Sequence, residues 1–398
     1  MNNSSFYKEL EEDIKTAKPA KVIESGQGSY LRIEGKEKLN LCSSHYLGFP
    51  QNPRIKVAVK TTMDKYGLAT GYRTLAGTHT LHIDLEDAIA KFKGTQDALT
   101  FSSAYLANAA AIQTIIGKED ILISDELNHA SIIDAVRLSQ VKNKFIYKHA
   151  DPVDLEEKLK EAREFAKTPK NDGNIPRILV VTDGVFSMDG DLAPLPEIVR
   201  LAKEYEALTM VDDAHGEGVL GKGGRGVVDH FGLVGQVDIE VGSLSKAISS
   251  SGGFIASNKK LITYYRMHAR QRLFSASLSL ADSAAALEAI KILLESDEPV
   301  KKLWENTKYM KDEFKRLGFD VGNSESPITP VMIGDEEKTR EMSARLYELD
   351  VFATPIIFPM VEKGKARIRV IPSASHTKED LDKGLAAFEK VGKEVGII

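Results

Sequence analysis

Short apolar runs separated by helical segments fill the middle of the chain, and this alternation constrains the fold more than any other feature. The runs, rich in Val, Ile and Leu, are residues 98–101, 121–124, 145–148, 178–182, 209–212 and 239–242. Segments with helical periodicity lie between them, at residues 108–116, 131–138, 155–166 and 195–205. Strands that alternate with helices pair in parallel, and strands buried on both faces are continuously apolar. The pattern predicts an α/β fold with a mainly parallel central sheet and helices on both of its faces.

The length of the chain indicates more than one domain. A chain of 398 residues exceeds the size at which a single hydrophobic core stops growing. A helix over residues 5–17 and a hairpin of 30–33 with 39–42 open the chain, and a long helix over 280–317, broken near Pro299, comes late in it. We therefore predict an N-terminal segment at 1–50, a large domain at 51–290 and a small C-terminal α+β domain at 291–398.

Charge and cysteine content exclude several classes of function. The net charge is only −5 and no block of like charges occurs, so binding to nucleic acid or to an anionic membrane has no electrostatic support. Cys42 is the only cysteine, so neither an internal disulfide nor a cysteine-based zinc site can form. Neither a signal-peptide pattern nor an apolar stretch long enough to span a bilayer is present, so we expect a cytoplasmic protein.

Ionisable side chains follow several of the predicted strands. In open α/β sheets, ligands bind beyond the carboxyl ends of the strands, and polar groups gathered there are costly to bury unless they face a ligand. Asp212 and His215 follow one strand and Lys246 follows the next. A lysine for a Schiff base and a carboxylate for a pyridinium nitrogen are the parts that pyridoxal 5′-phosphate (PLP) requires. The sequence therefore predicts a PLP enzyme that acts on a small amino acid.

Three segments, found in the same order, resemble the α-oxoamine synthase family. They are ISDELNHASII at 123–133, TDGVFSMDG at 182–190 and VDDAHG at 211–216. The resemblance covers nearly the whole chain and implies the fold type I architecture of aspartate aminotransferase. It also implies PLP as cofactor, an amino acid and an acyl-CoA as substrates, and a homodimer whose active sites are shared across the interface.

The resemblance assigns roles around the cofactor ring. Lys246 would form the Schiff base and act as the base, His129 would stack on the ring, and Asp212 would hold the ring nitrogen. Ser187 and His215 would bond around the phenolic oxygen. Lys246, His129, His215 and Asp212 form the expected catalytic set, with His129 or His215 polarising the thioester carbonyl.

The resemblance also places the phosphate and the substrate. Backbone N–H groups near Ala104 and Tyr105, at a helix start, would bind the phosphate because a helix N-terminus favours anions. Ser243 would add a hydroxyl, and Ser275 would reach in from the neighbouring subunit. Arg369 matches the arginine that clamps the amino-acid carboxylate with two hydrogen bonds.

The chain departs from the family at two positions near the expected site. Members commonly carry Asn before Tyr-Leu-Gly, where this chain has His45, which we place in the substrate-binding segment. Ser249 stands where glycine is usual, and serine at a positive φ would be strained. Arg367 is expected to be a surface or packing arginine outside the site. The patterns G-x-G-x-x-G at 221–226 and S-x-x-K at 243–246 lack their required context and are accidental.

Three functions stay open from the sequence. The segments at 128–133 and 186–190 look closest to glycine C-acetyltransferase, also called 2-amino-3-ketobutyrate CoA ligase, which implies that glycine and acetyl-CoA give 2-amino-3-oxobutanoate and CoA. The alternative is 8-amino-7-oxononanoate synthase, which uses alanine and pimeloyl-CoA and decarboxylates the adduct. A third, of another class, is a catalytically idle PLP-binding module. No metal site is expected.

Overall fold

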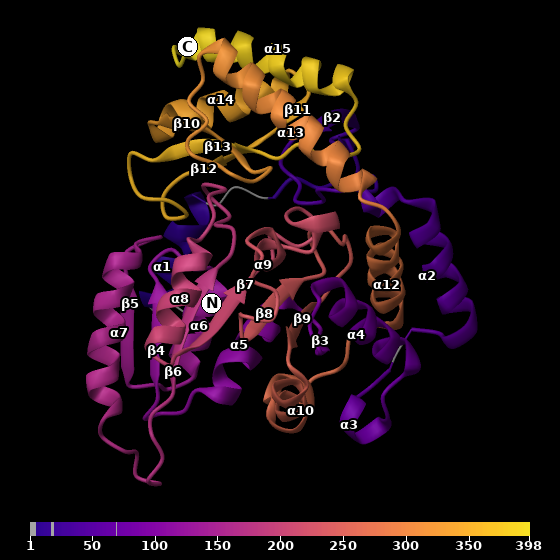
Figure 1. The fold of residues 1–398 in the computed structure, drawn as a ribbon. Helices are drawn as coiled ribbons and strands as arrows, with labels where there is room; N and C mark the ends of the chain where they lie inside the picture. Colours follow the sequence, from indigo (N-terminus) through magenta and orange to yellow (C-terminus); the bar gives the residue numbers. More distant parts are fainter. Residues whose placement is uncertain (1–4, 17–19, 69) are drawn as a thin grey trace.

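A seven-stranded sheet forms the centre of the larger domain (Figure 1), as seen in a computed structural model that describes residues 5–16, 20–68 and 70–398. The strand order is β3 (Asp97–Phe101), β9 (Gly253–Ser257), β8 (Ile239–Ser243), β7 (Leu208–Asp212), β6 (Ile178–Asp183), β4 (Ile121–Asp125) and β5 (Asn143–Tyr147). β9 runs antiparallel to both of its neighbours, whereas the strands from β8 to β5 pair in parallel. The predicted mainly parallel α/β fold is confirmed, and β9 is a strand that the sequence pattern did not predict.

Helices cover both faces of this sheet and bury its apolar side chains. The helices on one face are α4 (Thr80–Lys93), α7 (Pro152–Ala166), α8 (Leu195–Glu204) and α12 (Leu280–Glu295), with α2 (Pro53–Tyr66) packed outside α4 and α12. On the other face lie α5 (Ala104–Ile115), α6 (Ala130–Leu138) and α10 (Lys259–His268). Ala98 contacts the first set and its neighbour Leu99 the second, because successive residues of a strand face opposite sides.

The smaller domain carries two three-stranded sheets (Figure 1). One has the order β10 (Thr329–Gly334), β13 (Ala366–Val370), β12 (Thr354–Ile356); the other has the order β1 (Tyr30–Ile33), β2 (Lys36–Asn40), β11 (Val351–Phe352). Helices α13 (Glu298–Leu317), α14 (Glu336–Glu348) and α15 (Lys378–Val395) complete its core. The predicted N-terminal hairpin is therefore present, and it pairs in parallel with β11 from the C-terminal part of the chain.

The long helix predicted over residues 280–317 consists of two helices. α12 ends at Glu295, and α13 starts at Glu298 with Pro299 in its first turn, where the missing N–H of proline leaves no hydrogen bond unmade. The predicted domain boundary at residue 290 lies inside α12. Short helical turns connect the larger elements: η1 (Phe49–Gln51), α3 (Arg73–Ala76), η2 (Lys222–Gly224), α9 (Val227–His230) and α11 (Arg270–Leu273).

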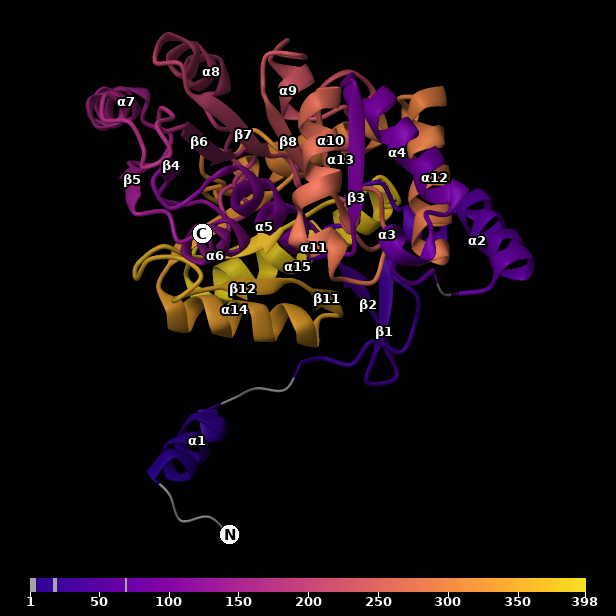
Figure 2. The same cartoon turned by 90° about the horizontal axis from the view of Figure 1, so that it is seen from below.

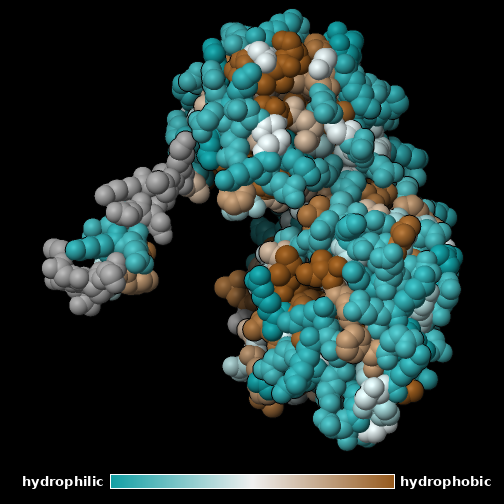
Figure 3. Space-filling view, turned by 90° about the vertical axis from the view of Figure 1, so that its left-hand side faces the viewer, coloured by the Kyte–Doolittle hydropathy of each residue, from teal (hydrophilic) through white to brown (hydrophobic). Residues whose placement is uncertain are grey.

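Helix α1 (Ser5–Thr16) lies apart from the rest of the chain (Figures 2 and 3). It exposes Phe6, Tyr7 and Ile14. The helix predicted over 5–17 is confirmed to residue 16, and residue 17 lies outside the described residues. None of the helices in the described part of the chain combines the length and apolar character that a membrane crossing requires.

Candidate active site

A cavity with about 350 Å³ of empty space, including its mouth, lies beyond the carboxyl ends of the parallel strands. Its lining residues are Ala104, Tyr105, Asn108, His129, Ser131, Asp183, Val185, Ser187, Asp212, Ala214, His215 and Lys246. Seven of these were predicted for the site: Ala104, Tyr105, His129, Ser187, Asp212, His215 and Lys246. Most of the predicted cofactor residues therefore meet in one place.

Asp212, at the end of β7, is held by two donors. Its Oδ2 accepts a hydrogen bond from Asn108 Nδ2 at 2.6 Å, and its Oδ1 accepts one from the Ala214 N–H at 3.0 Å. Asn108 lies one helical turn after Ala104 on α5, so the helix that begins at the cavity also orients the carboxylate. A carboxylate fixed in this way suits a protonated ring nitrogen.

His129 is the N-cap residue of α6 and is kept neutral. Its Nδ1 accepts the Ser131 N–H at 3.2 Å and lies 2.7 Å from Ser131 Oγ, which in turn accepts Asn108 Nδ2 at 2.9 Å. This network assigns the proton to Nε2. Burial lowers the pKa of His129, with nearby Asp212 opposing the shift. A neutral imidazole at this position can lie against an aromatic ring without bringing a second cation close to Lys246.

His215 is also uncharged, and a tyrosine fixes its orientation. Tyr46 Oη lies 2.8 Å from His215 Nδ1. Burial holds the pKa of His215 well below its usual range, and the nearby cations of Lys246 and Arg369 add to that effect. Burial raises the pKa of the Tyr46 hydroxyl, so Tyr46 keeps its proton. In the tautomer in which Tyr46 donates to Nδ1, the Nε2–H of His215 is a donor for a ligand in the cavity.

Lys246 lies three residues beyond β8 and lines the cavity. Burial lowers the pKa of its ammonium group, whereas the charges of Asp212 and Asp183 act in the opposite direction. A buried lysine with a lowered pKa supplies the neutral amine that adds to an aldehyde. The backbone turns sharply after it: Ser249 has a φ of 58°, and its N–H donates to the Lys246 carbonyl at 2.9 Å. Ser249 therefore adopts the left-handed conformation, which glycine adopts with less strain.

The start of α5 lines the same cavity and has the N–H groups that an anion would need. Ser103 caps the helix by accepting the Leu106 N–H at 3.2 Å, which leaves the first-turn N–H groups of Ala104 and Tyr105 without helical partners. β9 passes close beneath, because a Cβ on Gly253 would lie only 2.5 Å from the Ala104 nitrogen. Glycine at residue 253 thus lets the sheet and the helix start approach each other.

Four predicted residues lie outside the cavity lining. Ser243 is buried at the end of β8 with its Oγ 2.8 Å from Ser245 Oγ, and Ser275 is half-buried after α11, between the exposed residues Phe274 and Ala276. Arg369 on β13 donates from Nη1 to the Ser187 carbonyl at 2.8 Å, which brings the guanidinium to the cavity wall. His45 lines a separate small cavity, where its Nδ1 is buried without a hydrogen-bond partner in the described part of the chain. Their proposed contacts with ligands stay predictions.

Three polar residues of the cavity were not predicted for the site: Asn108, Ser131 and Asp183. Asn108 and Ser131 lie in segments that the sequence identifies only as helical. The available signal was that Asn108 lies one turn after Ala104 and Ser131 two residues after His129. Asp183 pairs in register with Asp212, and burial holds its pKa well above the usual range, with the charge of Asp212 adding to the shift. Asn108 Oδ1 and Asp183 Oδ1 are buried and have no partner among the described residues.

Together these features fit PLP. A helix start with free N–H groups, a fixed carboxylate, a neutral histidine and a buried lysine line one cavity. Two buried oxygens of that lining, on Asn108 and Asp183, have no hydrogen-bond partner among the described residues and can accept from a polar ligand. A phosphate at the α5 N-terminus would meet N–H donors, and a ring between it and Asp212 would lie beside His129.

A second, larger cavity adjoins the first at Ser187. It has about 1710 Å³ of empty space, including open solvent, between the 186–191 loop and the smaller domain. Arg367 lines it and is a packing arginine, not a surface one: it is 1% exposed, pairs with Asp189 and donates to the Met188 carbonyl at 3.3 Å. Arg367 and Arg369 lie two apart on β13, so both reach the same loop.

His149 holds the other end of that loop. Its Nδ1 lies 3.1 Å from Asp125 Oδ1, its Nε2 lies 2.9 Å from Asp191 Oδ2, and its ring meets Phe186 edge-on at 4.3 Å. Although burial opposes it, bonding to the two carboxylates raises the pKa of His149 to about 10. The wall shared by the two cavities is thus fixed by an imidazolium on one side and by two arginines on the other.

Comparisons with known proteins agree with this site. The family model described as aminotransferase class I and II matches residues 36–388. A relative named 8-amino-7-oxononanoate synthase from Thermosipho melanesiensis is 57% identical over 95% of this chain and 94% of its own, and one of the same name from Fervidobacterium nodosum is 54% identical over 98% and 99%. A solved structure described as serine palmitoyltransferase from S. paucimobilis, with bound PLP and myriocin, has a TM-score of 0.91 and 32% identity over the full length of both chains.

Proposed function

Since the chain belongs to the α-oxoamine synthase family of fold type I, PLP-dependent acyltransferases, we propose that it is an 8-amino-7-oxononanoate synthase. It would join alanine to pimeloyl-CoA and release CoA and carbon dioxide. The observation that carries the choice is the identity of 57% and 54%, over nearly full length, to two relatives of that name. The glycine and acetyl-CoA reaction expected from the short motifs is now the less supported reading.

The residues of the cavity have complementary tasks in this proposal. PLP, when bound, supplies an electron sink that stabilises negative charge at the amino-acid Cα. Lys246 carries the cofactor and then takes the proton from Cα, for which its lowered pKa suits it. Asp212, fixed by Asn108, keeps the ring nitrogen protonated, and His129 lies against the ring. His215 donates from Nε2 to the oxygen on which charge develops.

The two arginines and the second cavity serve the substrates. Arg369 binds the carboxylate of alanine, because its guanidinium lies at the wall of the first cavity and has donors beyond the one given to the Ser187 carbonyl. The acyl-CoA reaches the site through the second cavity, which shares Ser187 with the first and is wide enough for an extended thioester. Ser275 reaches the phosphate of the other subunit in a homodimer, as the surface position of its segment allows.

Substrate turnover tests the proposal. Purified protein with PLP is offered alanine, glycine or serine, each with pimeloyl-, acetyl- or palmitoyl-CoA, and the release of free CoA thiol and of carbon dioxide is followed. We expect both products only with alanine and pimeloyl-CoA, and none from Lys246→Ala, which should also lack the visible absorbance of lysine-bound PLP. Turnover of glycine with acetyl-CoA and no carbon dioxide would restore the glycine C-acetyltransferase reading. PLP absorbance with no turnover of any pair would support the idle binding module.

A further inference from the structure

Four ionisable side chains lie buried together beneath the Lys246 segment. Lys93 on α4, Asp213 and Glu217 after β7, and Glu240 on β8 are each between 0% and 2% exposed. Lys93 Nζ lies 2.6 Å from Asp213 Oδ2 and 3.1 Å from Glu240 Oε2, and donates to the Arg225 carbonyl at 2.8 Å. The ammonium group of Lys93 thus donates to Asp213 and to the Arg225 carbonyl and forms an ion pair with Glu240, and Glu217 is not among its partners.

Glu217 differs from the other two carboxyl groups of this cluster because, among the described residues, it forms no ion pair, whereas Asp213 and Glu240 both pair with Lys93. Neither of its carboxyl oxygens has a hydrogen-bond partner there either. Its Oε2 packs on the backbone of β8, since a Cβ on Gly242 would lie 1.9 Å from it. Burying an ionised carboxylate without donors is far more costly than burying a neutral acid. The surroundings thus favour the protonated form.

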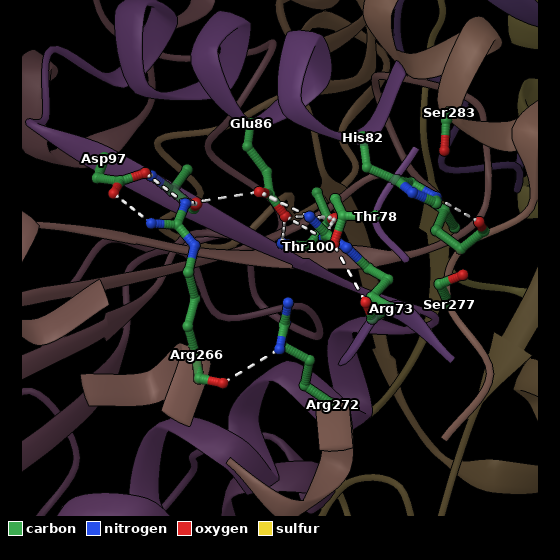
Figure 4. A network of polar contacts seen from close by, with 12 residues as sticks. Arg73, Thr78, His82, Glu86, Asp97, Thr100, Arg266, Arg272, Ser277 and Ser283 are labelled. Carbon is green, nitrogen blue, oxygen red and sulfur yellow. Dashed lines mark hydrogen bonds and ion pairs between the residues drawn. The ribbon is translucent and has the colours of Figure 1, made fainter. Parts of the chain in front are cut away.

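Glu86 shows how this protein buries a charged glutamate (Figure 4). It is also 1% exposed, yet it accepts hydrogen bonds from Nη1 and Nη2 of Arg73 and from the N–H and the hydroxyl of Thr100, the last two at 2.9 Å each. Arg266 adds a second guanidinium 3.6 Å away. Glu86 and Glu217 are equally buried, but Glu86 has several hydrogen-bond donors around its carboxylate and Glu217 has none among the described residues. Glu86 is therefore a matched reference for Glu217.

The turn that carries Glu217 supports the lysine segment. A Cβ on Gly218 would lie 2.4 Å from the Cβ of Ala247, so this turn packs directly under the residue that follows Lys246. Glu217 is also close enough for a negative charge on it to raise the pKa of Lys246. An ionised Glu217 would therefore favour the ammonium form of the lysine, which cannot add to an aldehyde.

We propose that Glu217 is a neutral carboxylic acid in the folded protein, and that it is a positioning residue whose proton keeps a negative charge away from Lys246. The proposal rests on the cofactor role given to Lys246 above. Burial raises the pKa of Glu217 well above its usual range, with Lys93 opposing and Asp213 adding to the shift. The other charged groups around the cluster are Glu240 on β8, Asp229 on α9 and Lys246 itself.

Difference infrared spectroscopy tests the protonation state directly, using the full chain with PLP bound. At pH 7 the spectrum of wild type minus Glu217→Gln should contain the C=O stretch of a protonated carboxyl group. The spectrum of wild type minus Glu86→Gln, at the equally buried reference site, should lack it. Glu217→Leu, also neutral, should give the same difference band if the Gln variant folds poorly. Absence of the band with either Glu217 variant would overturn the proposal.

The pH dependence of PLP uptake tests the effect on Lys246. The rate at which the apo chain acquires the visible absorbance of lysine-bound PLP should have the same pH midpoint, within about 0.3 units, in wild type and Glu217→Gln. If Glu217 were ionised, its removal would move that midpoint lower by about one unit, and such a shift would refute the proposal. Loss of the visible absorbance in wild type would reject the role of Lys246 instead, and would leave the infrared result on Glu217 unaffected.

Discussion

Replacing His149 with glutamine removes an imidazole that bridges Asp125 and Asp191, and the resulting loss of stability should depend on pH. The pKa of His149 is raised to about 10 in the folded protein, above the usual 6.5 of an unfolded chain. A raised pKa contributes stability that is fully present below pH 6.5 and is lost as the pH rises towards 10. Because one pKa unit corresponds to about 1.4 kcal/mol, the difference sets an upper limit of about 5 kcal/mol.

We expect a smaller effect than this limit. The His149 side chain is 23% exposed, so solvent screens part of the interaction, and glutamine retains one hydrogen bond. We expect His149→Gln to lower the free energy of unfolding by about 3 kcal/mol at pH 6. For a chain of this length, that loss lowers the thermal midpoint by about 4 °C. The assay is a series of thermal scans of wild type and His149→Gln from pH 6 to pH 10.

The difference between the two proteins should narrow steadily across that range. The control is His230→Gln, at an exposed histidine at the end of α9, whose difference from wild type should stay flat. A His149→Gln difference of the same size at pH 6 and pH 10 would show that packing against Phe186, and not the imidazolium charge, stabilises the loop.

Three further substitutions test contacts around the site. Asp189→Ala should destabilise the fold by about 3 kcal/mol, because it leaves the buried Arg367 guanidinium without a carboxylate. Arg367→Met should cost only about 1 kcal/mol, because Asp189 is 44% exposed and water can hydrate it. Equal losses of stability for the two variants in thermal scans would contradict this expectation. Ser249→Gly should be more stable than Ser249→Ala by about 1 kcal/mol, because both variants lose the hydroxyl but only glycine suits a φ of 58°. A more stable alanine variant in the same thermal scans would argue against backbone strain at this position. Asn108→Ala should weaken PLP binding about tenfold by removing the 2.6 Å bond to Asp212, and unchanged affinity in a fluorescence titration would exclude that role.

The part of the site that follows strands could be predicted from the sequence. Asp212 ends a continuous apolar run, and Lys246 stands shortly after the next, so the rule for open α/β sheets was enough to bring them together. Asn108 and Ser131 could not be found in this way, because helical periodicity does not tell which polar residue of a helix faces a ligand. Their roles depend on the packing of α5 against α6.

Residues whose partners are distant in sequence were harder to interpret. Arg367 looks like its neighbour Arg369 in the sequence, and its partner Asp189 is 178 positions away. Strand β9 has five residues and begins with glycine, so its own sequence pattern does not identify it as a strand. Its antiparallel position between β3 and β8 depends on pairing with these two neighbours. At Ser249 a local prediction was possible: the sequence indicated a serine at a positive φ, and the backbone there has a φ of 58°.

The pairing of β2 with β11 has a consequence for how the chain acquires its structure during synthesis. The two strands meet at Leu39 and Val351, so a hairpin made among the first forty residues must wait for more than three hundred others before its open edge is covered. Contacts between such distant residues form late, because a long loop has to close first. The edge of β2 therefore stays unpaired while the larger domain is synthesised. The smaller domain can complete its sheet only after nearly all of the protein has left the ribosome.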